Sequence, residues 1–296
     1  MRRVLQIRIA AASDGRLLRD YLRREWNVST ALLRKIKTYP NGMLLNGKPV
    51  FVTAPVHTGD ILELLLDDGA AQSAYTPCTL PVSAVYEDDD LLLVDKPAGM
   101  PVHPGPGHHG DTLSDAVVTG YQARGQRFVF RPVNRLDAGT SGLLAIAKNA
   151  YIHQRLKQQL HTDAFIREYL AVAVGVIDRP GTIDAPIARC ADSVIRRRVD
   201  AAGAPAVTTY TPVRCANGYT LLRLRLYTGR THQIRVHLAY IGHPLAGDFL
   251  YGAELPGFHR VALHACLLAL QHPLTGQTLT FESPLPAPLA ALLGDV

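Results

Sequence analysis

From residue 80 onward, the chain is a succession of short apolar runs separated by turn residues, and this pattern restricts the possible folds more than any other feature. Runs of strand length are "LLLVDKP", "SGLLAIAK" and "REYLAVAVGV". "AVTTYTPVRCANGYTLLRLRLYTGR" and "LHACLLALQHPLTGQTLTFESP" predict hairpins, the first around Asn217-Gly218. "AYIHQRLKQQLHTD" and "THQIRVHLAYIGH" predict helices. Hairpins with interspersed helices predict an α+β domain with a mainly antiparallel, mixed central sheet and flanking helices.

The composition excludes several protein classes. The chain has 296 residues, 47% of them hydrophobic, which is enough for a large core and more than one domain. No apolar run approaches the ~20 residues of a membrane span, and the basic start reads as a strand, so no membrane partner is expected. The cysteines have no paired spacing, which argues against disulfides or a zinc ribbon and predicts a reducing, cytoplasmic location. They are Cys78, Cys190, Cys215 and Cys266.

The first 66 residues differ in character from the rest. "GRLLRDYLRREW" and "VSTALLRKIKT" have helical spacing, with Ser29 or Thr30 as the expected N-cap of the second helix. Asn-Gly pairs and short apolar runs then predict turns and small strands. The small, polar stretch at 67–79 predicts a linker. We therefore expect an N-terminal module at 1–66, a linker at 67–79 and a larger domain at 80–296.

The net charge of +6 lies in this module. Residues 1–66 carry 11 Lys and Arg against 5 Asp and Glu, whereas the remaining 230 residues carry 20 of each. A basic face of this kind usually meets phosphates, although a solvated surface explains the charge alone about as well. The candidate RNA-binding residues of the two helices are Arg16, Arg19, Arg23, Arg34, Lys35 and Lys37.

One carboxylate stands out in "RPVNRLDAGTSGLL". Asp137 lies beside Arg135 and just before a glycine-bearing turn that leads into a predicted buried strand. Gly139 and Gly142 permit a tight path that holds a side chain at the rim of a sheet. In a partly dry cleft, such a carboxylate needs a cation in order to stay charged. Spacing alone also allows an aspartate that merely caps a turn.

Two arginines occur close together in "YTGRTHQIRVHLAYIGHPLAGDFLYG". Arg230 precedes the predicted helix, and Arg235 follows a His-Gln pair. With polar residues between them, they are arranged to meet an anion or a polar group.

Several segments, in order, resemble the RluA-type RNA pseudouridine synthases. They include "LLLVDKPAGMPVHPG", "RPVNRLDAGTSGLLAIAKNA", "REYLAVAVG", "RRRVDAAGAPAVTTYTPV", "TGRTHQIRVHLAYIGHPLAGDFLYG" and the closing "LHACLLALQHPLTGQTLTFESPLP". The resemblance covers roughly residues 80–286. Residues 1–66 resemble the α-L RNA-binding module, which many members of this family carry. The resemblance therefore implies the pseudouridine synthase fold with a small N-terminal α-L domain.

The resemblance also implies roles for individual residues. Asp137 matches the catalytic aspartate, and Tyr169 matches the tyrosine that packs on the target base. Arg230 best matches the basic residue that pairs with the aspartate, and Arg135 matches an arginine that enters the gap left by the flipped nucleotide. Asn134 stands where the family often has histidine, a departure that leaves the carboxylate in place.

The chemistry of such an isomerase agrees with these residues. Breaking a glycosidic bond, turning the uracil and rejoining it through carbon needs no redox partner, nucleotide or metal, so no cofactor is expected. Extruding the nucleotide costs a few kcal/mol, and an aromatic ring can replace the lost stacking at ~1–3 kcal/mol per base. Asp137 would act at the sugar as a nucleophile or as a base, and the sequence does not choose between them.

Other interpretations remain open. A non-catalytic RNA-binding assembly factor would not need the aspartate, tyrosine and arginine set. A two-carboxylate glycosidase would need a second acid, and none stands out. The histidines of "HPGPGHHGD" and the His232–His237 spacing are weak metal signals without a cysteine cluster. The expected partner is RNA, ribosomal RNA before transfer RNA, and the expected oligomeric state is a monomer.

Overall fold

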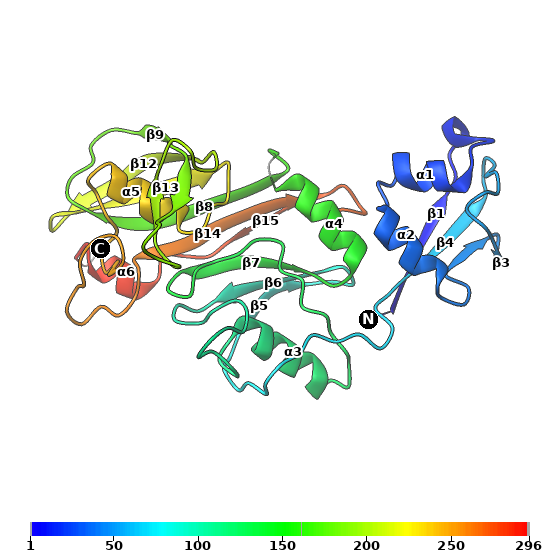
Figure 1. Cartoon of the computed structure of the whole chain (residues 1–296), viewed down its shortest axis with the longest axis horizontal. Helices are drawn as coiled ribbons and strands as arrows, with labels where there is room; N and C mark the ends of the chain where they lie inside the picture. Colours follow the sequence, from blue (N-terminus) through cyan, green and yellow to red (C-terminus); the bar gives the residue numbers. More distant parts are fainter. Residues whose placement is uncertain (1, 161, 295–296) are drawn as a thin grey trace.

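The computed structural model describes residues 2–160 and 162–294. Its N-terminal unit has a four-stranded sheet of its own, and the larger unit is built on a nine-stranded sheet (Figure 1). The small unit lies at one end of the larger one, next to α4 (Ala150–Gln159) (Figure 1). Within the described ranges, no helix has both the length and the apolar character needed to cross a membrane.

The N-terminal unit is an antiparallel sheet of order β1-β4-β2-β3, with two short helices that were both predicted from sequence. Ser29 is the N-cap of the second helix, because its side chain accepts a hydrogen bond from the backbone N–H of Leu32. In chain order, the elements are β1 (Arg2–Arg8), a 3-10 turn (Ala11–Ser13), α1 (Leu18–Arg24), α2 (Thr30–Lys37), β2 (Met43–Leu45), β3 (Lys48–Pro49) and β4 (Ile61–Asp67).

The larger unit confirms the predicted α+β class. Its sheet has the order β5-β6-β7-β14-β8-β13-β12-β9, with β15 paired to β14. The strands are β5 (Ser83–Glu87), β6 (Leu91–Lys96), β7 (Ser141–Ala147), β8 (Phe165–Val174), β9 (Gly181–Asp184), β12 (Val207–Ala216), β13 (Tyr219–Leu226), β14 (Leu263–Gln271) and β15 (Thr278–Glu282). A separate two-stranded sheet consists of β10 (Ile187–Arg189) and β11 (Arg197–Val199).

All pairs in the large sheet are antiparallel except β7 with β14, so the sheet is mixed, as predicted. Gly142 lies at this parallel contact with a φ of +112°. A β-carbon there would come within 2.3 Å of the backbone oxygen of Ala265. The close approach of the two strands therefore requires glycine at this position.

The predicted β12–β13 and β14–β15 hairpins are confirmed. Asn217 and Gly218, at the turn of the first hairpin, both have positive φ values, as a tight hairpin turn requires. The predicted helices are α4 and α5 (Gln233–Tyr240), and two more, α3 (Leu113–Ala123) and α6 (Ala287–Ala291), were not predicted.

The segment at 67–79 joins the two units but follows a fixed path along the larger one. The backbone N–H of Ser73 donates to the carbonyl of Phe128, and that of Thr76 donates to the Asp115 carboxylate. The N–H of Cys78, whose side chain is buried, donates to the Thr119 hydroxyl. The expected linker is therefore bound to α3 and its flanking loop rather than free.

The N-terminal unit makes direct contact with α4. The Tyr151 hydroxyl donates to the backbone carbonyl of Trp26 at 2.9 Å, and the backbone N–H of Ser29 donates to the Gln154 side chain at 3.2 Å. Buried apolar side chains of both units form one continuous cluster, which includes Leu22, Leu33, Ile152 and Leu156.

Asp68 is a buried carboxylate at the junction. It forms a two-pronged pair with Arg131 of the larger unit, at 2.5 and 3.0 Å, and lies 3.3 Å from the ammonium of Lys35 on α2. Its side chain is 3% exposed, so the two cations replace most of its hydration. The pair fixes the start of the connecting segment to both units.

Replacing Asp68 by alanine should therefore destabilise the protein, because Arg131 would lose its carboxylate partner. We expect the free energy of unfolding to fall by about 2–3 kcal/mol, less than for a fully buried pair because Arg131 keeps some solvent. Urea unfolding would measure the change. The control is Asp89→Ala, which removes a largely exposed carboxylate 3.3 Å from Arg3 and should cost under ~1 kcal/mol. Equal effects of the two substitutions would contradict the role given to Asp68.

Candidate active site

Asp137 lies on the loop that leads into β7, where it was predicted. Residues 131–133 run beside β7, with the N–H of Val133 donating to the carbonyl of Ala145. The amide of buried Asn134 accepts from the N–H of the same Ala145. The N–H of Thr140 then donates to the carbonyl of Asp137 and closes the turn. The loop is therefore held on both sides of the carboxylate.

Lys96 fastens this loop to the one after β6. Its ammonium is buried and donates to the backbone carbonyls of Pro97 and Met100, both at 2.8 Å, and of Ala138 at 3.3 Å. Burial, and secondarily the charge of Arg260, lowers the pKa of Lys96 to about 7. Because Ala138 follows Asp137 directly, this contact helps to fix the backbone that carries the carboxylate.

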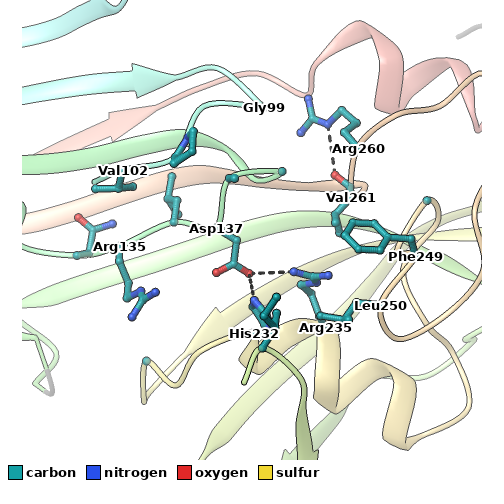
Figure 2. A pocket seen from close by; sticks show the side chains of 18 of the residues that line it. Gly99, Val102, Arg135, Asp137, His232, Arg235, Phe249, Leu250, Arg260 and Val261 are labelled. Carbon is teal, nitrogen blue, oxygen red and sulfur yellow. Dashed lines mark hydrogen bonds and ion pairs between the residues drawn. The ribbon is translucent and has the colours of Figure 1, made fainter. Parts of the chain in front are cut away.

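The cation that faces Asp137 is Arg235. Its Nη1 lies 3.5 Å from Oδ2 of Asp137, and Figure 2 shows the carboxylate pointing at Arg235 and His232. The pairing expected of Arg230 is wrong: its side chain is exposed, and its Nε donates to the carbonyl of Pro205. The physical reason is that Arg230, in the turn before α5, is bound to Pro205, whereas Arg235, within the helix, reaches Asp137.

Arg235 is itself held by a second, fully buried carboxylate. Its Nε and Nη2 donate to the two oxygens of Asp248, each at 2.7 Å. Burial alone would lower the pKa of Arg235, but the hydrogen bonds and charge of Asp248, together with the charge of Asp137, outweigh burial and raise it. Arg235 thus stays charged and has a fixed orientation toward Asp137.

His232 completes the group around Asp137. Its Nε2 is 3.9 Å from Oδ2 of Asp137, and its Nδ1 is 2.8 Å from the Tyr251 hydroxyl. That hydroxyl oxygen already accepts from the N–H of Arg197. We therefore assign the Tyr251 hydroxyl as the donor to Nδ1 and place the ring proton on Nε2, which faces the carboxylate. Burial lowers the pKa of His232 and favours the neutral ring, and the charge of Asp137 only partly opposes this.

The carboxylate opens into a pocket of about 1140 Å³. Arg135 is exposed and lines it. A smaller adjoining pocket is lined by Asp137, Tyr169, Arg135 and Arg230. Tyr169 projects from β8, and burial raises the pKa of its hydroxyl. The structure thus brings all four predicted residues to one cavity. The catalytic roles of Asp137 and Tyr169 and the RNA-binding role of Arg135 stay predictions, whereas the predicted pairing of Arg230 is contradicted.

The basic residues predicted for the N-terminal module are not equivalent. Arg16 pairs with Glu25 at 2.6 Å, Arg19 lies 3.5 Å from Asp20, and Lys35 pairs with Asp68. Arg23 donates to the Thr30 hydroxyl. Arg34 and Lys37 are exposed on α2 and have no carboxylate within ion-pair distance among the described residues. Of the six predicted residues, these two are the cations left free of hydrogen-bond or ion-pair partners within the described chain.

Sequence reasoning missed Asp248 and His232 as site residues. Asp248 follows the helix by eight residues, in a loop, and nothing in its spacing links it to Asp137. His232 was considered as a metal ligand with His237 and as a polar residue between Arg230 and Arg235, but not as a neighbour of Asp137. In the described part of the chain, no group of three or more His, Cys, Asp and Glu side chains could hold a metal ion.

His237 instead anchors the helix that carries Arg235. Its Nε2 donates to the carbonyl of Ala185, and its Nδ1 accepts from the Thr208 hydroxyl, both at 2.9 Å. The side chain is fully buried, and burial lowers its pKa below the ordinary 6.5. The neutral ring therefore belongs to the folded state.

This histidine should make the stability depend on pH. As the pH falls below 6.5, the unfolded chain binds a proton at His237 that the folded chain does not yet bind. The free energy of unfolding should therefore decrease down to the folded-state pKa. In His237→Gln, which keeps a donor for Ala185, the decrease between about pH 7.5 and about pH 5 should be smaller. Thermal unfolding across this range would measure it, with exposed His109→Gln as the control. Parallel curves for parent and His237→Gln would contradict the assignment.

Comparison with known proteins gives this geometry a context. A family model described as RNA pseudouridylate synthase matches residues 90–240, about half of the chain. Ribosomal large subunit pseudouridine synthase D of Pasteurella multocida is 38% identical over 278 residues, which cover 88% of this chain and 85% of the relative. The Escherichia coli K12 protein of the same name is 34% identical over 293 residues, which cover 93% and 86%.

A solved structure agrees with these sequence matches. Human RNA pseudouridylate synthase domain containing 1 matches with a TM-score of 0.57 and 26% sequence identity, over 69% of this chain and 83% of that one. The family model, the long sequence matches and the shared fold lead to one conclusion. The chain belongs to the RluA-type family of RNA pseudouridine synthases, which are isomerases.

Proposed function

We propose that this enzyme converts specific uridines of large-subunit ribosomal RNA to pseudouridine, with Asp137 as the catalytic carboxylate. The observation that carries the proposal is the position of Asp137, fixed beside Arg235 and open to a large pocket that Tyr169 adjoins. The choice of RNA is supported by the names of the Pasteurella multocida and Escherichia coli relatives.

The reaction rearranges bonds within one nucleotide. The bond between the anomeric carbon and N1 of uracil breaks, the base turns, and C5 bonds to the same carbon. The hydrogen on C5 leaves to solvent, and N1 takes up a proton, so the atoms and the charge balance. Asp137 acts either by attacking the anomeric carbon or by removing a proton from its neighbour. Both routes need an ionised carboxylate, and Arg235 stabilises that charge.

Access to the sugar requires the uridine to leave its helix. Extrusion costs a few kcal/mol, and it is offset when the base packs on an aromatic ring. Tyr169 lies in the same small pocket as Asp137, so the extruded base would lie over its ring with the sugar at the carboxylate. Arg135 is exposed at the rim, where it can fill the gap left in the RNA.

Asp137→Asn tests the proposal directly. Large-subunit ribosomal RNA transcribed with tritium at C5 of uridine should lose tritium to water with the parent enzyme and not with the variant, while filter binding stays unchanged. Mapping the product would identify the uridine, and transcripts of transfer RNA form a second arm. Turnover by Asp137→Asn within about tenfold of the parent would refute the role of the carboxylate. Release from transfer RNA alone would refute the proposed target.

Asp248 acts through Arg235, so its loss should affect turnover more than binding. In Asp248→Asn, the guanidinium would no longer be held by two charged hydrogen bonds, and its position beside Asp137 would shift. We expect the single-turnover rate to fall about 10²-fold while the Kd for RNA changes little. Asp192→Asn, on an exposed loop, is the control. A Kd increase as large as the fall in rate would show that Asp248 serves the overall fold or RNA binding instead.

We further propose that the N-terminal unit binds RNA through α2. Because Arg34 and Lys37 have no carboxylate partner among the described residues, replacing both by glutamine should weaken binding to a ribosomal RNA transcript. It should also flatten the slope of log K against log salt by roughly 1.5. Arg16→Gln, whose arginine is already paired with Glu25, should change the slope less. If Arg34→Gln/Lys37→Gln leaves both affinity and slope unchanged, the charge of α2 serves another purpose.

A further inference from the structure

One cation at the cavity has no anionic partner among the residues that the structure describes. Arg167 of β8 is 7% exposed, yet no carboxylate of the described residues lies within 4.0 Å of its guanidinium. Its Nη2 makes one long contact, 3.4 Å from the carbonyl of Leu160, and its buried Nε has no hydrogen-bond partner. A buried guanidinium without an anion is costly, so the free protein is poised to accept one.

Arg167 lies close to the candidate active site. Arg167 and Tyr169 are two residues apart on one strand, so both side chains lie on the same sheet face, roughly 6.5–7 Å apart along the strand. Arg167 lines both the large pocket and the small one that contains Asp137. Its guanidinium therefore lies beside the place proposed for the extruded base.

The loop above Arg167 leaves room for close approach. A β-carbon at Gly229 would come within 3.1 Å of Nη1 of Arg167, so a side chain there would crowd the guanidinium. Gly229 lines both pockets with Arg167. The absence of a side chain leaves the guanidinium accessible from the cavity.

The charge around the cavity favours an anion. Its lining includes six basic side chains, Arg135, Lys157, Arg167, Arg230, Arg235 and Arg260, but only two acidic ones, Asp137 and Glu254. Arg235 is already neutralised by Asp248. Lys157 of α4 lines the same large pocket as Arg167. The charge of Arg167, after burial, contributes to the lowered pKa of Lys157, as expected for two cations on one cavity.

We infer that Arg167, which shares the large pocket with Lys157, is a binding site for a phosphodiester next to the extruded uridine. This inference rests on the proposed function, which supplies the RNA. A phosphodiester carries one negative charge and two free oxygens, which match the forked donors of a guanidinium. The contact forms only when the nucleotide has entered the cavity. It therefore couples extrusion of the base to neutralisation of a buried charge.

The test pairs a protein variant with a modified RNA. The probe is a short synthetic RNA hairpin centred on the uridine mapped above. In two separate versions of it, the phosphate before or the phosphate after this uridine is replaced by an uncharged methylphosphonate. Arg167→Met should lower kcat/KM for the unmodified hairpin roughly ten- to hundredfold. One methylphosphonate should lower kcat/KM of the parent similarly and should have little further effect on the variant. Arg167→Lys should recover part of the loss.

Two measurements separate this role from a structural one. Because Arg167→Met removes an unpaired buried charge, the RNA-free variant should unfold at the same temperature as the parent or higher. Arg223→Met, which removes an exposed arginine paired with Glu168, is the matched control and should respond to the methylphosphonate as the parent does. Independent, additive effects of Arg167→Met and of both methylphosphonates would overturn the inference. The inference would also be overturned by a second outcome. In it, free phosphate inhibits the parent and Arg167→Met relieves that inhibition, while the methylphosphonates have no effect on the parent. If the parent itself makes no pseudouridine, the proposed function fails instead.

Discussion

The active site depends on one buried guanidinium shared by two carboxylates. Asp248 binds two edges of Arg235 at 2.7 Å, while Asp137 approaches the remaining Nη1 at 3.5 Å. The tighter pair fixes the cation, and the looser pair leaves the oxygens of Asp137 available to a substrate. If the strengths were reversed, Asp137 would be occupied by its own counterion. The asymmetry of the two distances therefore leaves Asp137 accessible from the cavity.

The helix that carries Arg235 is held by polar groups as well as by apolar packing. Gln233 uses its amide to bind the backbone of Arg230 and Val207, and His237 binds Ala185 on the other side. His232, at the start of the helix, has a left-handed backbone with φ of +57°. That conformation is unusual for a histidine, and it accompanies the approach of the ring toward Asp137.

Periodicity and turn chemistry predicted most strands, both hairpins and the loop of Asp137, because these depend on residues close together in sequence. The Arg230 assignment came from the resemblance and was wrong. Arg235 and Asp137 are 98 residues apart in sequence, so no local pattern shows which arginine meets the carboxylate. Asp248 gave no local signal at all. The unpredicted α3 did have one: Leu113, Val117, Val118 and Tyr121 follow helical spacing after the N-cap Thr112. The contact of Tyr151 with Trp26 joins residues 125 apart, beyond the reach of any local pattern.

That last contact has a consequence for how the protein is made. The N-terminal unit leaves the ribosome first, but the surface that it packs against includes α4 and Arg131, which are synthesised much later. Until then, Trp26 and the apolar residues near it are not packed against α4, and Asp68 has no ion pair with Arg131. The new chain therefore carries a basic, partly uncovered module while translation continues. Its final docking is a late step of folding, completed only after more than half of the chain has been synthesised.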